Sequence, residues 1–202
     1  MPPPRLDRPR LWLVAGPNGS GKSTLYDRRD IEGFGRSVWI INPDTLTAQI
    51  QAQENRPLLL ANLEALRRIE AWLLSSIRAY QTIGVETVLS TPKYRPMVQQ
   101  AKALGFEIRL LYVTLRAAEL NVDRVRLRVS RGGHDVAEDK IRERRERSFQ
   151  QLPWFLRHAD LALVYDNSGA EPLLVGRKQD GVVTLDPTAP EAIRRAVEAA
   201  AD

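Results

Sequence analysis

The chain has 202 residues, with 30 Lys and Arg against 25 Asp and Glu, and it contains no cysteine. Its length suits one α/β domain with a core of its own, and the lack of cysteine excludes disulfide bonds and thiolate zinc sites. The formal net charge of +5 suits anionic substrates but is too small by itself to indicate nucleic-acid binding.

The first ten residues, MPPPRLDRPR, are rich in proline and arginine and predict a flexible leader over residues 1–10. The apolar run LWLVAG after them is far too short for a signal-peptide core or a membrane span. We therefore expect a cytoplasmic protein, which the absence of cysteine also fits.

Residues 15–24 read AGPNGSGKST and match the phosphate-binding pattern GxxxxGK[ST]. The run LWLVA before them predicts a buried strand, and KSTLYDRRDI predicts the start of a helix, which is the strand–loop–helix order that the motif requires. In this order the loop N–H groups surround the phosphates, the lysine reaches the terminal ones and the serine can ligate Mg²⁺. The expected cofactors are ATP or GTP and Mg²⁺, with Ser23 as metal ligand. The expected nucleotide-binding residues are Gly16, Pro17, Asn18, Gly19, Ser20, Gly21, Lys22, Ser23 and Thr24.

The elements after this loop alternate between strand and helix. Residues 37–42 predict a buried strand that ends in the turn NPD, because branched and aromatic residues run into a proline. Apolar residues at helical spacing predict a long helix over 57–84 that closes with a glycine. A strand over 85–90, a short helix over 95–105 and a strand over 106–115 follow. The apolar face expected on the long helix contains Leu59, Leu63, Leu66, Ile69, Leu73 and Ile77.

The C-terminal part predicts a helix from about Ala117, the loop RGGHDV and a charged helix over 137–147. A strand over 161–168, an edge hairpin over 171–185 and a terminal helix complete the chain. Strands that alternate with helices predict parallel β-α-β crossovers with helices on both faces. We therefore expect an α/β P-loop NTPase fold of the kinase type: a three-layer sandwich with a mostly parallel central sheet and an arginine-bearing lid, formed by a single domain over 11–202.

Two carboxylates are expected at the ligand-binding edge, beyond the carboxyl ends of the strands. Asp44 follows the second strand and could accept a proton from a substrate hydroxyl; alternatively it caps a helix, since NPDTL also resembles a helix start. Glu86 lies in an otherwise apolar strand, where an unpaired carboxylate is costly. Its partner could be a metal-bound water, a substrate hydroxyl, an arginine or a purely structural ion pair.

The arginine-dense segment that follows offers candidate phosphate-binding cations. Arg124, Arg128 and Arg131 share a helix face by their spacing, whereas Arg126 points elsewhere. Arg131 precedes two glycines, as expected of a mobile lid that brings a cation to a phosphate. His134 is a possible positioning group or a local hydrogen-bonding residue.

The next part of this segment, residues 142–147, predicts a solvated helix face. Glu143 and Glu146 alternate there with the arginines, which is typical of salt-bridged surface helices. We therefore expect the charge of Arg145 to be compensated in solvent.

The segments GPNGSGKST, INPD, ETVLST, RVRLRVSRGGHDV and YDNSG resemble the short zeta-toxin-like kinase family, in the family's order and over about residues 11–169. The resemblance implies phosphorylation of the 3′-hydroxyl of the sugar in UDP-N-acetylglucosamine by ATP or GTP, and a possible antitoxin partner. It also implies a loop lysine at Lys22, a catalytic base at Asp44 and phosphate-binding arginines at Arg124 and Arg131. The substrate-binding residues expected on this basis are Asp44, Glu86, Thr91, Arg128 and His134.

Two other functions remain open from the sequence. One is a P-loop kinase that phosphorylates another metabolite or a nucleotide with the same residues. The other is a nucleic-acid-binding ATPase whose arginines track a phosphate backbone. The interleaved Glu143 and Glu146 and the lack of an aromatic stacking platform argue against the second function.

Overall fold

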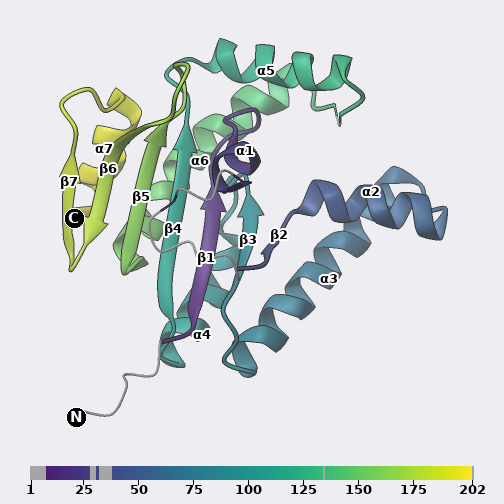
Figure 1. Cartoon of the computed structure of the whole chain (residues 1–202), viewed down its shortest axis with the longest axis horizontal. Coiled ribbons are helices and arrows are strands. Elements are labelled where there is room, and N and C mark those ends of the chain that lie inside the picture. The colour runs from purple at the N-terminus through teal and green to yellow at the C-terminus, as the bar shows by residue number, and fades with distance from the viewer. Residues whose placement is uncertain (1–7, 28–30, 32–37, 134, 202) are drawn as a thin grey trace.

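The computed structural model describes residues 8–27, 31, 38–133 and 135–201. Its strands form one seven-stranded sheet in the order β2-β3-β1-β4-β5-β6-β7 (Figure 1). The strands are β1 (Arg10–Ala15), β2 (Ile40–Ile41), β3 (Ile83–Thr87), β4 (Glu107–Thr114), β5 (Leu161–Asp166), β6 (Leu173–Gln179) and β7 (Val182–Leu185). The helices are α1 (Lys22–Asp27), α2 (Pro43–Glu54), α3 (Leu58–Arg78), the 3₁₀ turn η1 (Pro92–Tyr94), α4 (Arg95–Ala103), α5 (Ala118–Ser130), α6 (Glu138–His158) and α7 (Glu191–Ala201).

The first five strands pair in parallel, and β6 and β7 continue the sheet as an antiparallel hairpin. The central strands β1 and β4 are apolar on both faces, which is typical of parallel strands covered on both sides. One core cluster joins the sheet to α3, α4, α6 and α7, and a second, smaller cluster with Trp12 and Leu25 lies on the face of α1. The predicted α/β P-loop fold with a mostly parallel sheet is confirmed.

The long helix α3 buries the predicted stripe only in its second half, at Ile69, Leu73 and Ile77. Its buried positions follow a spacing of four, with alanines in the half that packs along α2: Ala61, Ala65, Ile69, Leu73 and Ile77. Leu59, Leu63 and Leu66 are exposed, so their expected burial is wrong. Small side chains let two helices approach closely, so the contact with α2 favours the alanines, and the leucines lie on other sides of α3.

Several predicted boundaries are wrong. The second strand is reduced to Ile40–Ile41, and a full helix, α2, begins directly after it. The long helix ends at Arg78, and the glycine expected to close it, Gly84, pairs inside β3. The charged helix continues to His158 through Pro153. Its second half is buried against the sheet, and this packing outweighs the helix-breaking tendency of proline.

The predicted leader lies mostly in residues 1–7, outside the described residues. Arg8, Pro9 and Arg10 contradict the prediction, because they already belong to the folded part. Arg8 Nε donates to the carbonyl of Gly105 at 3.0 Å, and the carbonyl of Pro9 accepts from the N–H of Glu107 at 2.9 Å. Arg10 is the first residue of β1. His134 also lies outside the described residues. None of the described helices combines the length and apolar character needed to cross a membrane.

Candidate functional site

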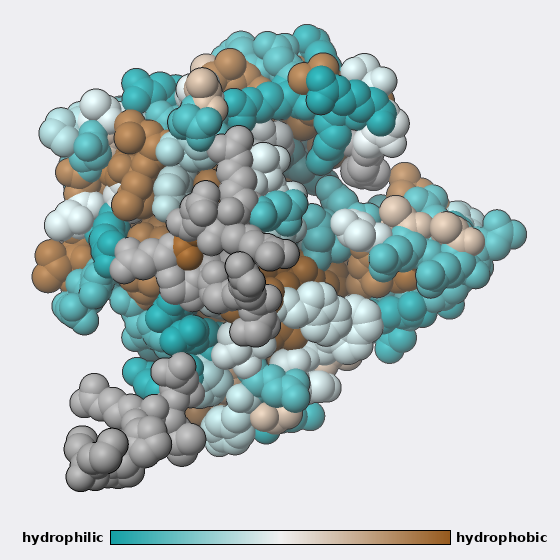
Figure 2. All heavy atoms as spheres, in the orientation of Figure 1, coloured by the Kyte–Doolittle hydropathy of each residue, from teal (hydrophilic) through white to brown (hydrophobic). Residues whose placement is uncertain are grey.

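A cavity of about 850 Å³ lies beyond the carboxyl ends of the parallel strands. Its walls come from the P-loop, the start of α2, α3, the end of β3 and the segment after it through η1, α5, α6 and the loop after β5. Figure 2 shows the surface hollowed between the part that contains α5, at the top, and the part formed by α2 and α3, at the right. The predicted site residues that line the cavity are Asn18, Gly19, Gly21, Lys22, Ser23, Thr24, Asp44, Glu86, Thr91, Arg124 and Arg128.

The glycines of the P-loop are required by their neighbours as well as by their backbone angles. Gly16 has φ 137°, and a Cβ there would lie 2.0 Å from the carbonyl oxygen of Val113 on β4. Gly21 has φ 87°, and a Cβ there would lie 2.3 Å from Nδ2 of Asn167 after β5. L-amino acids with side chains rarely adopt such angles. The loop can therefore keep its position against β4 and β5 only with glycine at both places.

Two asparagines that the sequence analysis did not select hold this loop. Asn167 Nδ2 donates to the carbonyl of Ser20 at 2.8 Å, and Asn121 Nδ2 donates to the carbonyl of Asn18 at 2.6 Å. The carbonyl of Asn167 also accepts from Arg124 at 2.7 Å. Asn167 belongs to the quoted segment YDNSG, which was the one available signal. It links the loop backbone to an arginine of α5.

The Lys22 ammonium lies inside the loop. Its Nζ donates to the carbonyls of Gly16 at 2.9 Å and Pro17 at 3.0 Å, and it lies 3.9 Å from a carboxylate oxygen of Glu86. Burial lowers the pKa of Lys22, and the charges of Glu86 and Asp44 oppose this shift. The lysine is therefore a buried cation held at the wall of the cavity, where a phosphate would replace the carbonyl contacts.

Glu86 joins three elements through one carboxylate oxygen. Oε2 accepts hydrogen bonds from Ser23 Oγ at 3.0 Å, Tyr26 OH at 3.1 Å and Asn42 Nδ2 at 2.9 Å. These donors and Lys22 are the partners that a carboxylate in an apolar strand needs. Burial and the Glu86 charge raise the pKa of Tyr26 to about 12, so its hydroxyl keeps its proton at neutral pH.

Asp44 lies in the first turn of α2 but does not cap the helix. The N-cap is Asn42, whose Oδ1 accepts from the N–H groups of Asp44 at 2.9 Å and Thr45 at 3.2 Å. The alternative in which Asp44 is the cap is therefore wrong. Its carboxylate is half-exposed, lines the cavity and lies 3.7 Å from Arg128. Asn42 thus connects Asp44 to Glu86, because its Oδ1 accepts from the N–H of Asp44 and its Nδ2 donates to the Glu86 carboxylate.

The arginines of α5 divide into two groups. Arg124 and Arg128 line the cavity, whereas Arg126 pairs with Asp123 and Glu138 on another face, as its position in the helix predicts. Arg131 follows the last residue of α5 and is exposed, and it is not part of the cavity wall among the described residues. Of the three arginines predicted to share a face, Arg124 and Arg128 thus line the cavity and Arg131 does not.

The expected solvated face of α6 is wrong for Arg145. Its side chain is buried, with 9% of the residue exposed, and its guanidinium donates to the carbonyls of Leu115 at 3.1 Å and Arg116 at 3.2 Å. It also lies over the ring of Phe149, 4.7 Å from the centroid. The reason is the rotation of α6. Its buried stripe contains Ile141, which packs on α5, together with Arg145 and Ser148, and the alternating charges concealed this stripe in the sequence.

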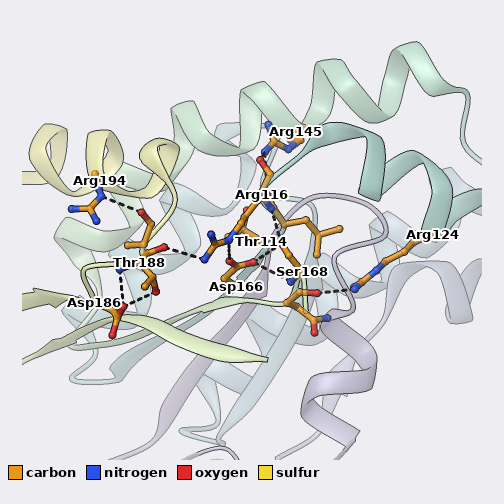
Figure 3. A network of polar contacts seen from close by, with 12 residues as sticks. Thr114, Arg116, Arg124, Arg145, Asp166, Ser168, Asp186, Thr188 and Arg194 are labelled. Atoms are coloured by element: carbon orange, nitrogen blue, oxygen red, sulfur yellow. Dashed lines mark hydrogen bonds and ion pairs between the residues drawn. The ribbon is translucent and has the colours of Figure 1, made fainter. Parts of the chain in front are cut away.

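Arg145 belongs to a polar network at the ends of β4 and β5 (Figure 3). The Arg116 that it holds donates from Nε to Asp166 at 2.6 Å and from its backbone N–H to Ser168 Oγ at 2.8 Å. Burial raises the pKa of Asp166, but hydrogen bonds from Ser168 and Arg116 outweigh burial and hold that pKa below its ordinary value. Asp166 and Ser168 are the neighbours of Asn167 in the sequence. Their hydrogen bonds therefore support the position of Asn167, which holds the P-loop.

The comparisons with known proteins agree with this geometry. Residues 11–152 match the AAA domain family. An uncharacterized protein of Haemophilus influenzae is 31% identical over an alignment of 144 residues, and the match covers 68% of this chain and 98% of that protein. Among solved structures, AvrRxo1-ORF1:-ORF2 with ATP has a TM-score of 0.68 at 15% identity, over 96% of this chain and 64% of that chain. One from the PezAT toxin–antitoxin system of Streptococcus pneumoniae has a TM-score of 0.59 at 16% identity, over 83% of this chain and 72% of that chain.

At these identities the solved structures show the fold alone, which is the α/β P-loop NTPase fold. The family match is of another kind, because it spans more than half of the chain and includes the P-loop, Asp44, Glu86 and the arginines of α5. This chain belongs to the AAA domain family of P-loop proteins.

Proposed function

We propose that the protein is a small-molecule kinase that transfers the γ-phosphate of ATP or GTP to a sugar hydroxyl. The acceptor proposed first is the 3′-hydroxyl of UDP-N-acetylglucosamine, as the resemblance to zeta-toxin-like kinases implies. One observation carries the proposal: a single cavity is lined by the P-loop lysine, by the carboxylate of Asp44, which does not cap α2, and by two arginines of α5. Phosphoryl transfer needs a phosphate cradle, a group that takes the hydroxyl proton and cations for the transferring charge.

The roles in this proposal follow from side-chain chemistry. Lys22 binds the terminal phosphates, and Asp44 accepts the proton of the acceptor hydroxyl. Arg124 neutralises charge on the transferring group, and Arg131 joins it when the segment after α5 closes. Glu86 positions Ser23 and Asn42, to which it is hydrogen-bonded.

Mg²⁺ is implied by the nucleotide, and the residues present fit it. Ser23 Oγ and the Glu86 carboxylate are hard oxygen donors on the cavity wall, 3.0 Å apart, and Mg²⁺ binds such ligands together with water and phosphate oxygens. These two residues would hold the ion, which would shield the charge of the phosphates.

Two similar folds support the biological side of the proposal. One comes from a toxin–antitoxin system, and the other was solved as a two-protein complex with ATP. We therefore include a protein partner of antitoxin type in the proposal.

The test is to incubate the protein with ATP or GTP, Mg²⁺ and a panel of UDP-sugars, nucleosides, sugar acids and free sugars, and to detect phosphorylated products by mass spectrometry. We expect a single phosphate on UDP-N-acetylglucosamine. Lys22→Ala is the control and should abolish transfer, because it removes the cation at the β- and γ-phosphates. A product from another acceptor would retain the kinase and replace the substrate, whereas full activity of Lys22→Ala would overturn the P-loop mechanism.

A further inference from the structure

The cavity is lined by more cationic residues than acidic ones. Its walls contain two acids, Asp44 and Glu86. Three cations lie near the P-loop and have partners there: Lys22 with Glu86, Arg128 with Asp44, and Arg124 with a backbone carbonyl. The full set of cationic residues in the walls is Lys22, Lys93, Arg124, Arg128, Arg144 and Arg147.

The remaining three cations come from η1 and α6, and a contact between α6 and the first residue of α4, which directly follows η1, brings these elements together. Arg95 donates to Gln151 of α6 at 2.8 Å and lies over the ring of Trp154, 5.1 Å from its centroid. Gln151 is one helical turn after Arg147, on the same face, and Lys93 is two residues before Arg95. Lys93 and the arginines of α6 thus form one wall of the cavity, on elements other than those that hold the P-loop.

This wall is made of Lys93, Arg144 and Arg147. Lys93 lies over the ring of Tyr94, 4.7 Å from its centroid, with the charge of Glu70 nearby, whereas the two arginines are poorly compensated within the protein. Arg144 forms no hydrogen bond or ion pair with any residue that the structure describes. Arg147 lies 3.4 Å from Glu143, but its Nε is buried without a hydrogen-bond partner. Guanidinium groups bind carboxylates and phosphates in pairs of hydrogen bonds, and neighbouring like charges are stabilised by an anion between them.

We propose that Lys93, Arg144 and Arg147 form an anion subsite for the phosphoryl acceptor, separate from the triphosphate site. The acceptor is then a hydroxyl compound that carries its own phosphate or carboxylate group, and neutral sugars are excluded. This inference rests on the proposed kinase function, because only that function makes the bound anion a phosphoryl acceptor. The subsite determines specificity, because it holds the charged end of the acceptor while its hydroxyl faces Asp44.

The test is to saturate the protein with Mg²⁺ and the non-hydrolysable analogue AMP-PNP, which fills the nucleotide site, and to titrate probes by calorimetry. The probes are UDP-N-acetylglucosamine, N-acetylglucosamine 1-phosphate, glucuronate and neutral N-acetylglucosamine. The variants are Arg144→Gln and Arg147→Gln. The matched control is Arg142→Gln on the same helix, because Arg142 pairs with Glu119 and does not line the cavity.

We expect each cavity variant to weaken binding of the anionic probes by about tenfold to a hundredfold, as for the loss of a charged hydrogen-bonded contact. Binding of AMP-PNP should be unchanged, and Arg142→Gln should behave as wild type. Phosphate-bearing probes that bind more tightly than glucuronate would assign the subsite to phosphate, and the reverse would assign it to carboxylate. Thermal unfolding followed by circular dichroism checks that each variant is folded.

Wild-type affinity of both cavity variants for the anionic probes would overturn the subsite, as would equal affinity of the wild type for neutral and phosphorylated sugar. Failure of the kinase function would look different. Phosphorylation of an acceptor with an unchanged KM in Arg144→Gln and Arg147→Gln would retain the kinase and remove the subsite. Anion binding that depends on these arginines, without phosphorylation of any acceptor, would retain an anion site and remove the kinase.

Discussion

The burial of the Arg145 guanidinium leads to a specific prediction about the stability of the protein. Arg145→Ala removes hydrogen bonds to the carbonyls of Leu115 and Arg116 and the contact with the Phe149 ring. Hydrogen bonds from charged donors contribute about 1.5–3 kcal/mol each, and a cation–π contact contributes about 0.5–2 kcal/mol. The variant also avoids the cost of burying a charge, which is several kcal/mol. We expect a net loss of about 2–3 kcal/mol, or a Tm lower by roughly 5–10 °C in a chain of this size.

The assay is urea unfolding followed by circular dichroism. The control is Arg142→Ala on the same helix. Arg142 is exposed and pairs with Glu119 at 2.7 Å, and such surface pairs contribute little, so its unfolding midpoint should match that of the wild type. Equal unfolding midpoints for the Arg145 and Arg142 variants would refute a stabilising role of the buried Arg145 and would agree with the solvent-exposed side chain that the sequence predicts.

Three further predictions concern the site and its support. Asp44→Asn should lower turnover by roughly two to four orders of magnitude with little change in nucleotide affinity, because an amide cannot take the hydroxyl proton; retained turnover would remove the base assignment. Arg131→Ala should lower kcat by about a hundredfold with an unchanged nucleotide Kd, because we propose that it acts only after closure; a loss below about fivefold would exclude it from the site. Asp166→Asn should be less stable than the wild type at pH 7. Since hydrogen bonds from Arg116 and Ser168 keep the Asp166 pKa low, its contribution is complete above the unfolded pKa of about 3.9 and is lost as the pH falls through the folded pKa. Urea midpoints measured against pH test this, and a difference that does not vary with pH would contradict it.

The P-loop side of the cavity was predictable because its signals are local. A P-loop is defined by consecutive residues, and Gly16, Gly21 and Lys22 occupy the positions that the pattern requires. Asp44 was selected because it follows the end of a strand, and Glu86 because a carboxylate in an apolar strand needs a partner. The structure places both on the cavity wall with the loop.

The cavity wall formed by α6 was not predictable, because the rotation of this helix decides which arginines line it. Arg142, Arg144, Arg145 and Arg147 have the same chemistry and alternate with the same acids. Packing of α6 buries Arg145, directs Arg144 and Arg147 into the cavity and pairs Arg142 with Glu119. A neighbouring residue on a helix points about 100° away, so a small error in the assumed rotation exchanges these roles.

The sequence by itself determined the P-loop, the alternation of strands and helices and hence the α/β P-loop fold, because these depend on runs of neighbouring residues. Only the tertiary structure decided that Asn42 and not Asp44 caps α2, and that Asn167 holds the P-loop. It also decided which arginines of α6 reach the cavity. The physical reason is that these contacts join residues far apart in the chain, and their geometry is determined only when the helices pack on the sheet.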